Sequence, residues 1–423
     1  MSKRTFPVHR GHWLHGSFPE YQLDPLGFYL NVRREVGDFC RIRMTATRSI
    51  TLLAHPEAVE HVLQRRQENY EKPPELKILF EGSLLTTGET EARAKRKLIQ
   101  PPYSTSHSEN ACRIILDSTT QFLDRIFLSP DDPLDINAEM TRLTLQIASI
   151  TLFDRDLSLP EDRVDDSFQE CLRYMGNPGG KVMISARFPF SKRRRAFLGA
   201  RLKLHALLGG IIRDHNNSDS PGGDILSQIL ARDTGSLLNP VENAFLLLLA
   251  SYLTMSNVLQ FAFRKLAEFP DIQNRAYEEI KETLRGSDPA LEDVKHLSFV
   301  SAVFEESMRL FPNFHLFYHA RKDDEISGYP ISAGTRVCLS SYVTHRHPEF
   351  WNDPTKFDPE RFLAADVLRH KFAYFPFGGG PRICLGKSFA MLEGPLILAS
   401  VLRRCRVESV GSQSHGLLRF RQR

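Results

Sequence analysis

The sequence predicts a mainly α-helical protein with small β-sheets, an α+β fold built as one large domain. Helical stretches punctuated by scattered Gly and Pro residues fill most of the 423 positions, and strand-like segments are few and short. Neither a Pro/Gly/Ser-rich linker nor an internal repeat divides the chain. We therefore expect residues 1–423 to form a single helix-rich domain, in which 24–88 and 316–340 contribute the β-rich part.

The first half begins with a helix over 24–36, because Pro25 has no N–H to lose in a first turn. Gly37 ends that helix. The same punctuation places the following elements: strands near 39–44 and 49–53, a helix over 55–65, an irregular loop over 68–87, helices broken by prolines from 88 to about 189, and a helix over 191–215.

The segment 239–269 predicts one long helix that ends before Pro270 and is apolar nearly all round, as expected of a helix buried on every side. At 1.5 Å per residue its roughly 30 residues span about 45 Å, enough to cross a domain. Its longest apolar run, 244–250, is far shorter than the roughly 20 residues that span a bilayer. We expect no transmembrane anchor. Because the N-terminus also lacks the apolar core of a signal peptide, we expect a cytoplasmic protein.

The composition is that of an ordinary globular protein. Hydrophobic residues make up 41% and charged residues 25%, and 55 Lys and Arg against 51 Asp and Glu give a net charge of +4. This balance excludes a disordered chain and a dedicated nucleic-acid arm. The basic run 192–195 is expected to be a solvated patch, so no nucleic-acid partner is predicted.

The last third changes character after a helix that ends at Phe311-Pro312. Short strands are expected over 316–340, then two loops rich in Pro, Gly and aromatic residues, and a last helix over 386–404. The second loop, 375–386, is the most informative segment. Its glycines allow close backbone approach to a flat group, and Cys384 stands at a helix start, where unpaired N–H groups stabilise a thiolate.

The chemistry of this loop suits axial ligation of haem iron by Cys384, with Arg382 as a cation for an acidic group. The other five cysteines show no CxxC or zinc-type spacing, and without a secretion signal all six are expected to be reduced. For an arbitrary cysteine, a buried thiol at a turn would be the better interpretation, but that does not explain the ten-residue arrangement.

Residues 377–386 resemble the cysteine-loop signature of the cytochrome P450 family, F-x-x-G-x-R-x-C-x-G, at every fixed position. The resemblance implies a haem-thiolate oxidoreductase with the P450 fold, a triangular, helix-rich domain, as in a soluble bacterial-type member. It implies haem b, with Cys384 as the metal ligand. The implied cofactor contacts in the loop are Phe377, Gly378, Gly380, Arg382 and Gly386.

A second motif of the family, E-x-x-R followed by a P-E-R-F loop, is matched at Glu306, Arg309 and Arg361. The resemblance implies that these three residues connect a helix to the segment before the cysteine loop. E-x-x-R alone is weak, because the chain repeats it at 139–142, 170–173 and 282–285, where an exposed ion pair is the better interpretation.

The resemblance further implies a pocket above the haem for a hydrophobic small molecule, for instance a secondary metabolite of terpenoid, polyketide or fatty-acid type. By family position Ala250 would lie at the cofactor. The substrate would meet four apolar residues: Leu253, Phe314, Leu316 and Phe317. A monooxygenase of this kind uses O2 and electrons from an acidic carrier of ferredoxin or flavodoxin type with its reductase. A basic surface formed by the helix around Arg96, with Lys387 and Arg403, suggests its docking face.

The long helix departs from the family pattern A-G-x-(D/E)-T-(T/S). Residues 250–255 read Ala-Ser-Tyr-Leu-Thr-Met, so the alcohol survives as Thr254 and the acid is replaced by Leu253. Thr254, with Ser251, is the expected catalytic pair for proton delivery, but Thr254 could equally bond its own helix backbone.

Two further departures concern the haem propionates. The family's W-x-x-x-R becomes Ala92…Arg96, and its R-x-A becomes Tyr318-His319-Ala320. Anchoring is then expected to depend on Arg96 and Arg382, with His319 or Tyr318 as a replacement donor. For Arg96 the plainer alternative is a solvated basic helix face.

Because the acid is missing, three functions stay open. The leading one is a monooxygenase. The first alternative is a non-classical haem-thiolate enzyme that uses peroxide, rearranges or dehydrates its substrate, or reduces a nitrogen oxide. The second is a haem-binding partner protein without turnover.

Overall fold

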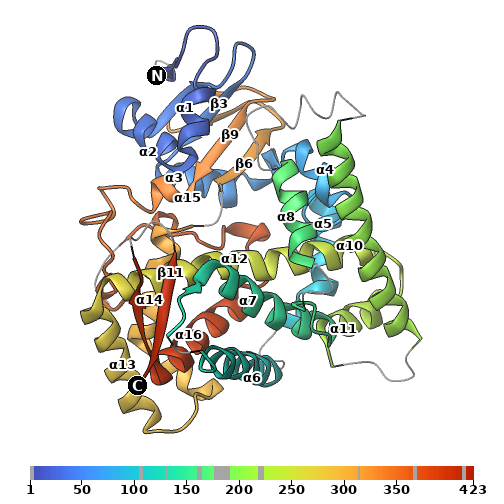
Figure 1. The fold of residues 1–423 in the computed structure, drawn as a ribbon. Coiled ribbons are helices and arrows are strands. Elements are labelled where there is room, and N and C mark those ends of the chain that lie inside the picture. Colours follow the sequence, from blue (N-terminus) through green and yellow to red (C-terminus); the bar gives the residue numbers. More distant parts are fainter. Residues whose placement is uncertain are drawn as a thin grey trace.

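Helices dominate the structure and surround a single long central one (Figure 1). The structure is a computed structural model that describes residues 4–103, 108–129, 131–159, 164–175, 191–217, 223–312, 315–364, 369–411 and 416–423. Its α-helices are α1 (Phe18–Leu23), α2 (Pro25–Val36), α3 (Pro56–Glu60), α4 (Lys77–Phe80), α5 (Glu89–Ile99), α6 (Ser108–Ile126), α7 (Ile136–Phe153), α8 (Val164–Met175), α10 (Lys192–Asn216), α11 (Ile225–Arg232), α12 (Pro240–Glu268), α13 (Pro270–Leu284), α14 (Ser298–Leu310), α15 (Ser341–Thr344) and α16 (Lys387–Arg404).

The strands form three small sheets. They are β1 (Val8–His9), β2 (Phe39–Arg43), β3 (Ser49–Leu53), β4 (Tyr70–Glu71), β5 (Leu134–Asp135), β6 (His315–Ala320), β7 (Asp324–Ile326), β8 (Tyr329–Ile331), β9 (Arg336–Ser340), β10 (Cys405–Ser409) and β11 (Leu417–Gln422). The largest sheet has the order β1-β2-β3-β9-β6-β4, the second β10-β11-β5, and the third pairs β7 with β8. The expected α+β class is confirmed.

The largest sheet joins distant parts of the chain and separates two apolar clusters. Strand β3 pairs in parallel with β9, and β9 pairs antiparallel with β6, with Phe317 opposite Cys338. Helix α2 packs on one face through Tyr29, in a cluster that Phe317 joins. Tyr318 belongs to the cluster that covers the other face, together with α3. Adjacent residues of β6 therefore point to opposite faces of the sheet.

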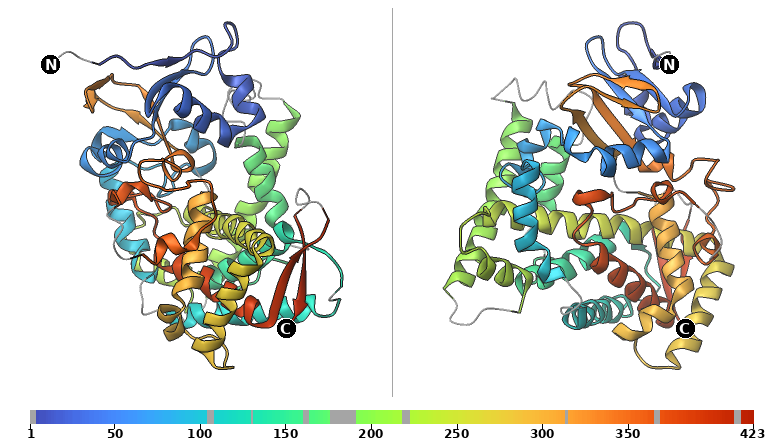
Figure 2. Two further views of the ribbon diagram at one scale, coloured as in Figure 1. Left: turned by 90° about the vertical axis from the view of Figure 1, so that its left-hand side faces the viewer. Right: turned by 180° about the vertical axis from the view of Figure 1, so that it is seen from behind.

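Helix α12 crosses the middle of the molecule, with the largest sheet on one side and α7 and α16 on the other (Figures 1 and 2). Asn239 caps its N-terminus by accepting a hydrogen bond from the Glu242 N–H, and Pro240 occupies the first turn. Helix α7 packs along it, and the Thr144 hydroxyl donates to the Tyr252 carbonyl at 3.0 Å. The expected long helix is confirmed.

By length and composition, α12 is the one helix in the described part of the chain that could cross a membrane. Half of its most apolar stretch is buried inside the protein, and buried core helices meet the same test.

The prediction of an irregular loop over 68–87 is wrong in part. The segment contains β4, which pairs Tyr70 with Ala320 and Glu71 with His319, and the short helix α4. Strand β4 has only two residues, too few to show an alternating pattern in the sequence, and its partner is about 250 residues away in the chain.

Candidate functional site: the cysteine loop and the open face of α12

The loop around Cys384 is closed by its own backbone. The Cys384 N–H donates to the Phe377 carbonyl at 3.0 Å, and the Gly378 N–H donates to the Phe375 carbonyl at 3.0 Å. Immediately after the cysteine, Gly386 precedes α16, and its carbonyl accepts the first helical bond, from Ala390 at 2.8 Å. The loop is therefore a rigid platform that holds the thiol at a helix start.

Three glycines shape this platform. Gly378 and Gly380 have φ of 71° and 64°, which L-residues rarely adopt. A Cβ at Gly380 would collide with the Leu63 carbonyl oxygen, and one at Gly379 would collide with the Phe372 ring. The loop is pressed against the segment after α3 and admits no side chain at these positions.

Cys384 is the one exposed cysteine of the six, all of which the structure describes. The thiol lies in a recess, open to solvent yet surrounded by protein atoms. Burial raises the pKa of Cys384, while a hydrogen bond from the Gly386 backbone and the positive charge of Arg96 lower it in part. An accessible sulfur held in a rigid loop near the charge of Arg96 is suited to bind a metal.

Arg96 is less exposed than two of its basic neighbours on α5. Arg93 and Lys97 are exposed, whereas Arg96 is half-buried. Burial lowers the pKa of Arg96, and the nearby Cys384 thiol partly offsets this. Its guanidinium has no hydrogen-bond or ion-pair partner among the described residues. The solvated-face alternative does not describe this position.

Arg382 is already paired with protein groups. Its Nε is 3.2 Å from Glu89 Oε2, and its Nη2 donates to the Thr87 carbonyl at 2.9 Å. Burial opposes ionisation of Glu89, but hydrogen bonds from Gln67, Arg93 and Arg382 outweigh it, so the pKa of this carboxyl is lowered. Glu89 was not among the predicted site residues. An acid at the start of a basic helix is ordinary, so no signal in the sequence marked it.

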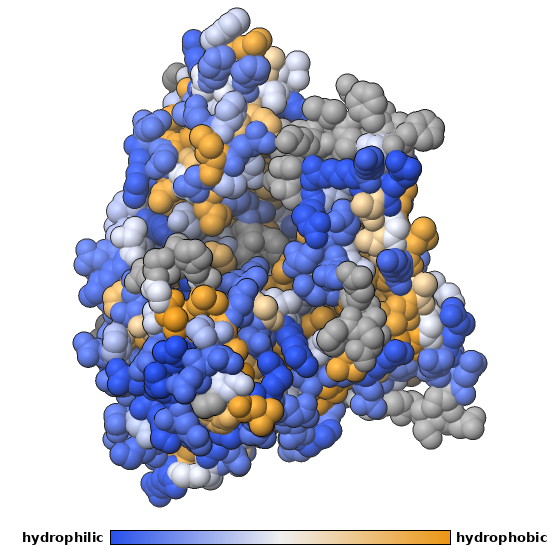
Figure 3. Space-filling view, viewed as in Figure 1, coloured by the Kyte–Doolittle hydropathy of each residue, from blue (hydrophilic) through white to orange (hydrophobic). Residues whose placement is uncertain are grey.

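One face of α12 is open although most of the helix is buried. Ala250 is exposed and Ser251, Leu253 and Thr254 are half-buried, whereas Tyr252 is fully enclosed. The Thr254 hydroxyl donates to the Ala250 carbonyl at 2.9 Å, which is the backbone bond considered as its alternative role. Leu253 packs against an apolar cluster that also includes Leu385. The surface is hollowed at the centre of the face shown in Figure 3, between the β-rich part above and the helices below and to the right.

Strand β6 separates the residues expected to contact the substrate. Leu316 packs with the cluster on the α3 face and Phe317 with the cluster on the α2 face, so the two side chains do not share one surface. Phe314 lies outside the described residues. Burial lowers the pKa of His319, as does Arg336, and its Nδ1 is buried with no partner among the described residues.

The expected charged network is present. The Glu306 carboxylate is fully buried and accepts hydrogen bonds from Arg309 at 2.6 and 2.7 Å and from Arg361 at 3.1 Å. Arg309 also donates to the carbonyls of His345, Pro354 and Lys356. The network thereby ties α14 to the segment that leads to the cysteine loop.

These features fit a haem group. A thiol in a rigid glycine platform can ligate the iron, and the exposed Ala250 has no side chain beyond its Cβ to obstruct a flat ring. The half-buried guanidinium of Arg96, which has no partner among the described residues, can bind a carboxylate.

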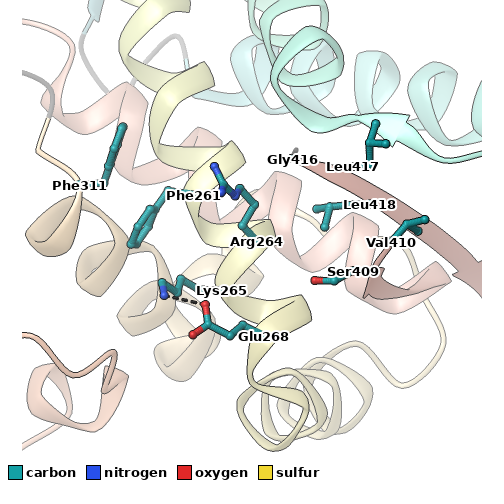
Figure 4. Close-up of a pocket in the computed structure, with 10 residues that line it drawn as sticks. All are labelled: Phe261, Arg264, Lys265, Glu268, Phe311, Ser409, Val410, Gly416, Leu417 and Leu418. Carbon is teal, nitrogen blue, oxygen red and sulfur yellow. Dashed lines mark hydrogen bonds and ion pairs between the residues drawn. The ribbon is translucent and has the colours of Figure 1, made fainter. Parts of the chain in front are cut away.

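A separate cavity of about 260 Å³ lies toward the C-terminal end of α12 (Figure 4). Figure 4 shows Phe261 and Phe311 on one side and residues of the β10–β11 hairpin on the other. Its walls include none of the residues expected in the site, so this cavity is distinct from the cysteine-loop site.

Comparison with known proteins relates the chain to one family of enzymes. The family profile "Cytochrome P450" matches residues 6–416. Cyclooctat-9-en-7-ol 5-monooxygenase of Streptomyces melanosporofaciens is 29% identical over 392 residues, covering 88% of this chain and 83% of that protein. Cyclooctatin synthase of the same organism is 30% identical over 401 residues, covering 88% and 84%.

A fusion protein and a solved structure extend the similarity. The bifunctional cytochrome P450/NADPH–P450 reductase 1 of Bacillus subtilis (strain 168) is 27% identical over 417 residues, which cover 92% of this chain but 38% of that longer protein. The crystal structure of the cytochrome P450DA haem domain matches with a TM-score of 0.87 at 21% identity, covering 100% of this chain and 99% of that one. The relatives' names support the monooxygenase interpretation and neither alternative.

Proposed function

The chain belongs to the cytochrome P450 family of haem-dependent oxidoreductases, and on this premise we propose that it is a haem b monooxygenase of secondary metabolism that hydroxylates a hydrophobic, terpenoid-type molecule. The observation that carries the proposal is the position of Cys384, an accessible sulfur at a helix start in a glycine loop. The two Streptomyces relatives support the substrate class, since one is named as a monooxygenase of cyclooctat-9-en-7-ol.

When bound, haem b supplies the iron chemistry that cleaves O2 and oxidises the substrate. The protein's part is to bind and orient. Cys384 would ligate the metal from the loop, and Arg96 and Arg382 would pair with the cofactor's carboxylates. Because Arg382 is 3.2 Å from Glu89, it can bind a carboxylate only while sharing or leaving that partner. Ala250 lets the ring approach α12 closely.

Proton delivery would depend on Thr254 and Ser251. The Thr254 hydroxyl donates to the Ala250 carbonyl, and its oxygen, like that of any hydroxyl, can accept a hydrogen bond from water or substrate. Leu253 carries no proton. Water held at Thr254, or a polar group of the substrate, would then take the place of the missing acid.

Electrons would come from an acidic carrier of ferredoxin or flavodoxin type. Lys387 is exposed at the start of α16, directly after the cysteine loop, and Arg93 and Lys97 are exposed on α5. Arg403 belongs less to this surface, because it donates to the Gly286 and Ser287 carbonyls and pairs with Asp288. We propose a cytoplasmic location, which agrees with this partner.

The substitution Cys384→Ser tests the proposal. The reduced carbon-monoxide complex of the wild type should show the red-shifted Soret band of a thiolate-ligated haem, and the variant should lack it. Cys405→Ser, at a buried cysteine, is the matched control and should keep the band. A band that survives in Cys384→Ser would refute the assignment.

The reaction type needs an assay with substrate in three conditions: O2 with NAD(P)H and a reductase pair, peroxide alone, and neither. Product in the first condition only is expected of a monooxygenase. Product formed without any reductant would contradict the proposal.

A further inference from the structure

Lys72 lies beside Tyr318, which occupies the position of the arginine in the family's R-x-A pattern. Strand β4 pairs Glu71 with His319, so the next residue of the antiparallel register, Lys72, lies opposite Tyr318. Lys72 Nζ donates a hydrogen bond to the Tyr318 hydroxyl at 2.9 Å and is 4.1 Å from the centroid of its ring. A cation is therefore present at the position of the family's arginine, and it comes from Lys72, the residue directly after β4.

The Lys72 ammonium has no counter-ion in the part of the chain that the structure describes. Its side chain is half-buried, and among the described residues no carboxylate lies within ion-pair distance. The nearest acids of the segment have other partners, because Glu71 is 3.9 Å from Arg321 and Glu75 is 3.2 Å from Arg336. Withdrawing a cation from water without an opposite charge costs free energy, which an incoming anion would recover.

The position of Lys72 connects it to the cysteine loop. At the start of the same short segment, the Gln67 amide donates to Glu89 Oε2 at 2.6 Å, and Glu89 in turn pairs with Arg382 of the loop. Tyr318 packs in one cluster with Phe372, which directly precedes the loop. Gln67, at the start of residues 67–72, thus contacts the partner of Arg382, and Lys72, at their end, contacts Tyr318, which packs beside the cysteine loop.

We propose that Lys72 and Tyr318 together bind one carboxylate of the haem, while Arg96, with Arg382 where it leaves Glu89, binds the other. The inference rests on the proposed cofactor. The Tyr318 oxygen accepts the hydrogen bond from Lys72, so its own O–H proton is available to donate to the carboxylate. The ammonium and the hydroxyl then form two adjacent donors, one of them charged, in place of the arginine.

The rate of haem loss tests this proposal. Holoprotein is mixed with excess apomyoglobin, and the transfer of haem is followed by the Soret band. Lys72→Ala should lose haem about tenfold faster than the wild type, because a charge-assisted hydrogen bond is removed. Tyr318→Phe should show a smaller increase. Lys77→Ala, an exposed lysine of the same segment, is the matched control and should equal the wild type.

Haem dimethyl ester separates carboxylate binding from a general loss of structure. When the apoproteins are reconstituted with this ester, Lys72→Ala and the wild type should release it at the same rate. A difference that persists with the ester would overturn the proposal, as would equal rates with ordinary haem. If the wild type binds no haem at all, the proposed function itself fails, which is a distinguishable result.

Discussion

Two regions of the molecule enclose charge, and they do so in opposite ways. Around Glu306 every charged group finds its partner within the protein, since Arg309 and Arg361 both donate to that carboxylate. Beside the cysteine loop, Arg96 has no ion-pair partner among the described residues, and Lys72 has only the Tyr318 hydroxyl.

The difference separates a structural role from a binding role. A closed network, with its donors and acceptors matched, fixes one arrangement of the chain and offers nothing to a ligand. A half-buried cation without a counter-ion favours the binding of an anion, so these two cations indicate a negatively charged ligand. The resemblance marked both regions by their arginines, but only the contacts distinguish the two roles.

The largest expected effect comes from removing the carboxylate of Glu306, which holds the charged network together. Glu306→Ala leaves Arg309 buried without its carboxylate, which should cost about 3–5 kcal/mol of folding free energy. We expect little haem-loaded protein, measured as the ratio of Soret to protein absorbance. Glu282→Ala, an exposed glutamate with the same spacing to an arginine on α13, is the control. A Glu306→Ala variant with full haem content would show that the network is dispensable.

A smaller effect is expected from neutralising an open cation. Arg96→Gln should leave the free energy of unfolding of the apoprotein unchanged or slightly higher, since the guanidinium has no described partner to lose. The same variant should release haem about tenfold faster to apomyoglobin. Lys97→Gln, an exposed neighbour on α5, should behave as the wild type. If Arg96→Gln unfolds the apoprotein instead, the contrast between the two regions is not valid.

A pH-dependent effect concerns a buried ionisable group, the carboxyl of Glu393 in α16. Burial raises the pKa of Glu393 to about 8. Between about pH 5 and 8 the folded protein therefore holds a proton that the unfolded chain releases, so stability should fall as pH rises through this window. Glu393→Gln should flatten this part of the Tm–pH curve, and Glu282→Gln should not. Identical slopes in Glu393→Gln and the wild type would contradict the raised pKa.

Local patterns predicted the parts of the fold whose signal lies in consecutive residues. Helix α12 follows from an apolar run bounded by prolines, and the cysteine loop follows from its glycines and Cys384. The network of Glu306, Arg309 and Arg361 needed the family's order of motifs, because an isolated E-x-x-R also describes exposed pairs.

The parts that were not predictable depend on contacts between distant segments. The two-residue strand β4 exists only because β6 is beside it, and it alone brings Lys72 to Tyr318. Arg382 was expected to face the cofactor, but its ion pair with Glu89 depends on how α5 meets the loop. Thr254 shows the same limit, since no sequence pattern decides whether a helical threonine bonds its own backbone.

The order of the site's residues along the chain has a consequence for biosynthesis. Lys72, Arg96, Thr254 and Tyr318 are all translated before Cys384, the residue expected to hold the metal. A nascent chain whose β6 has just emerged from the ribosome therefore carries Lys72, Arg96 and the residues of α12, but not yet the cysteine that would bind the iron. Haem insertion can be completed only after Cys384 has been translated, so limited haem supply should leave chains with an unfilled haem site exposed to chaperones and proteases.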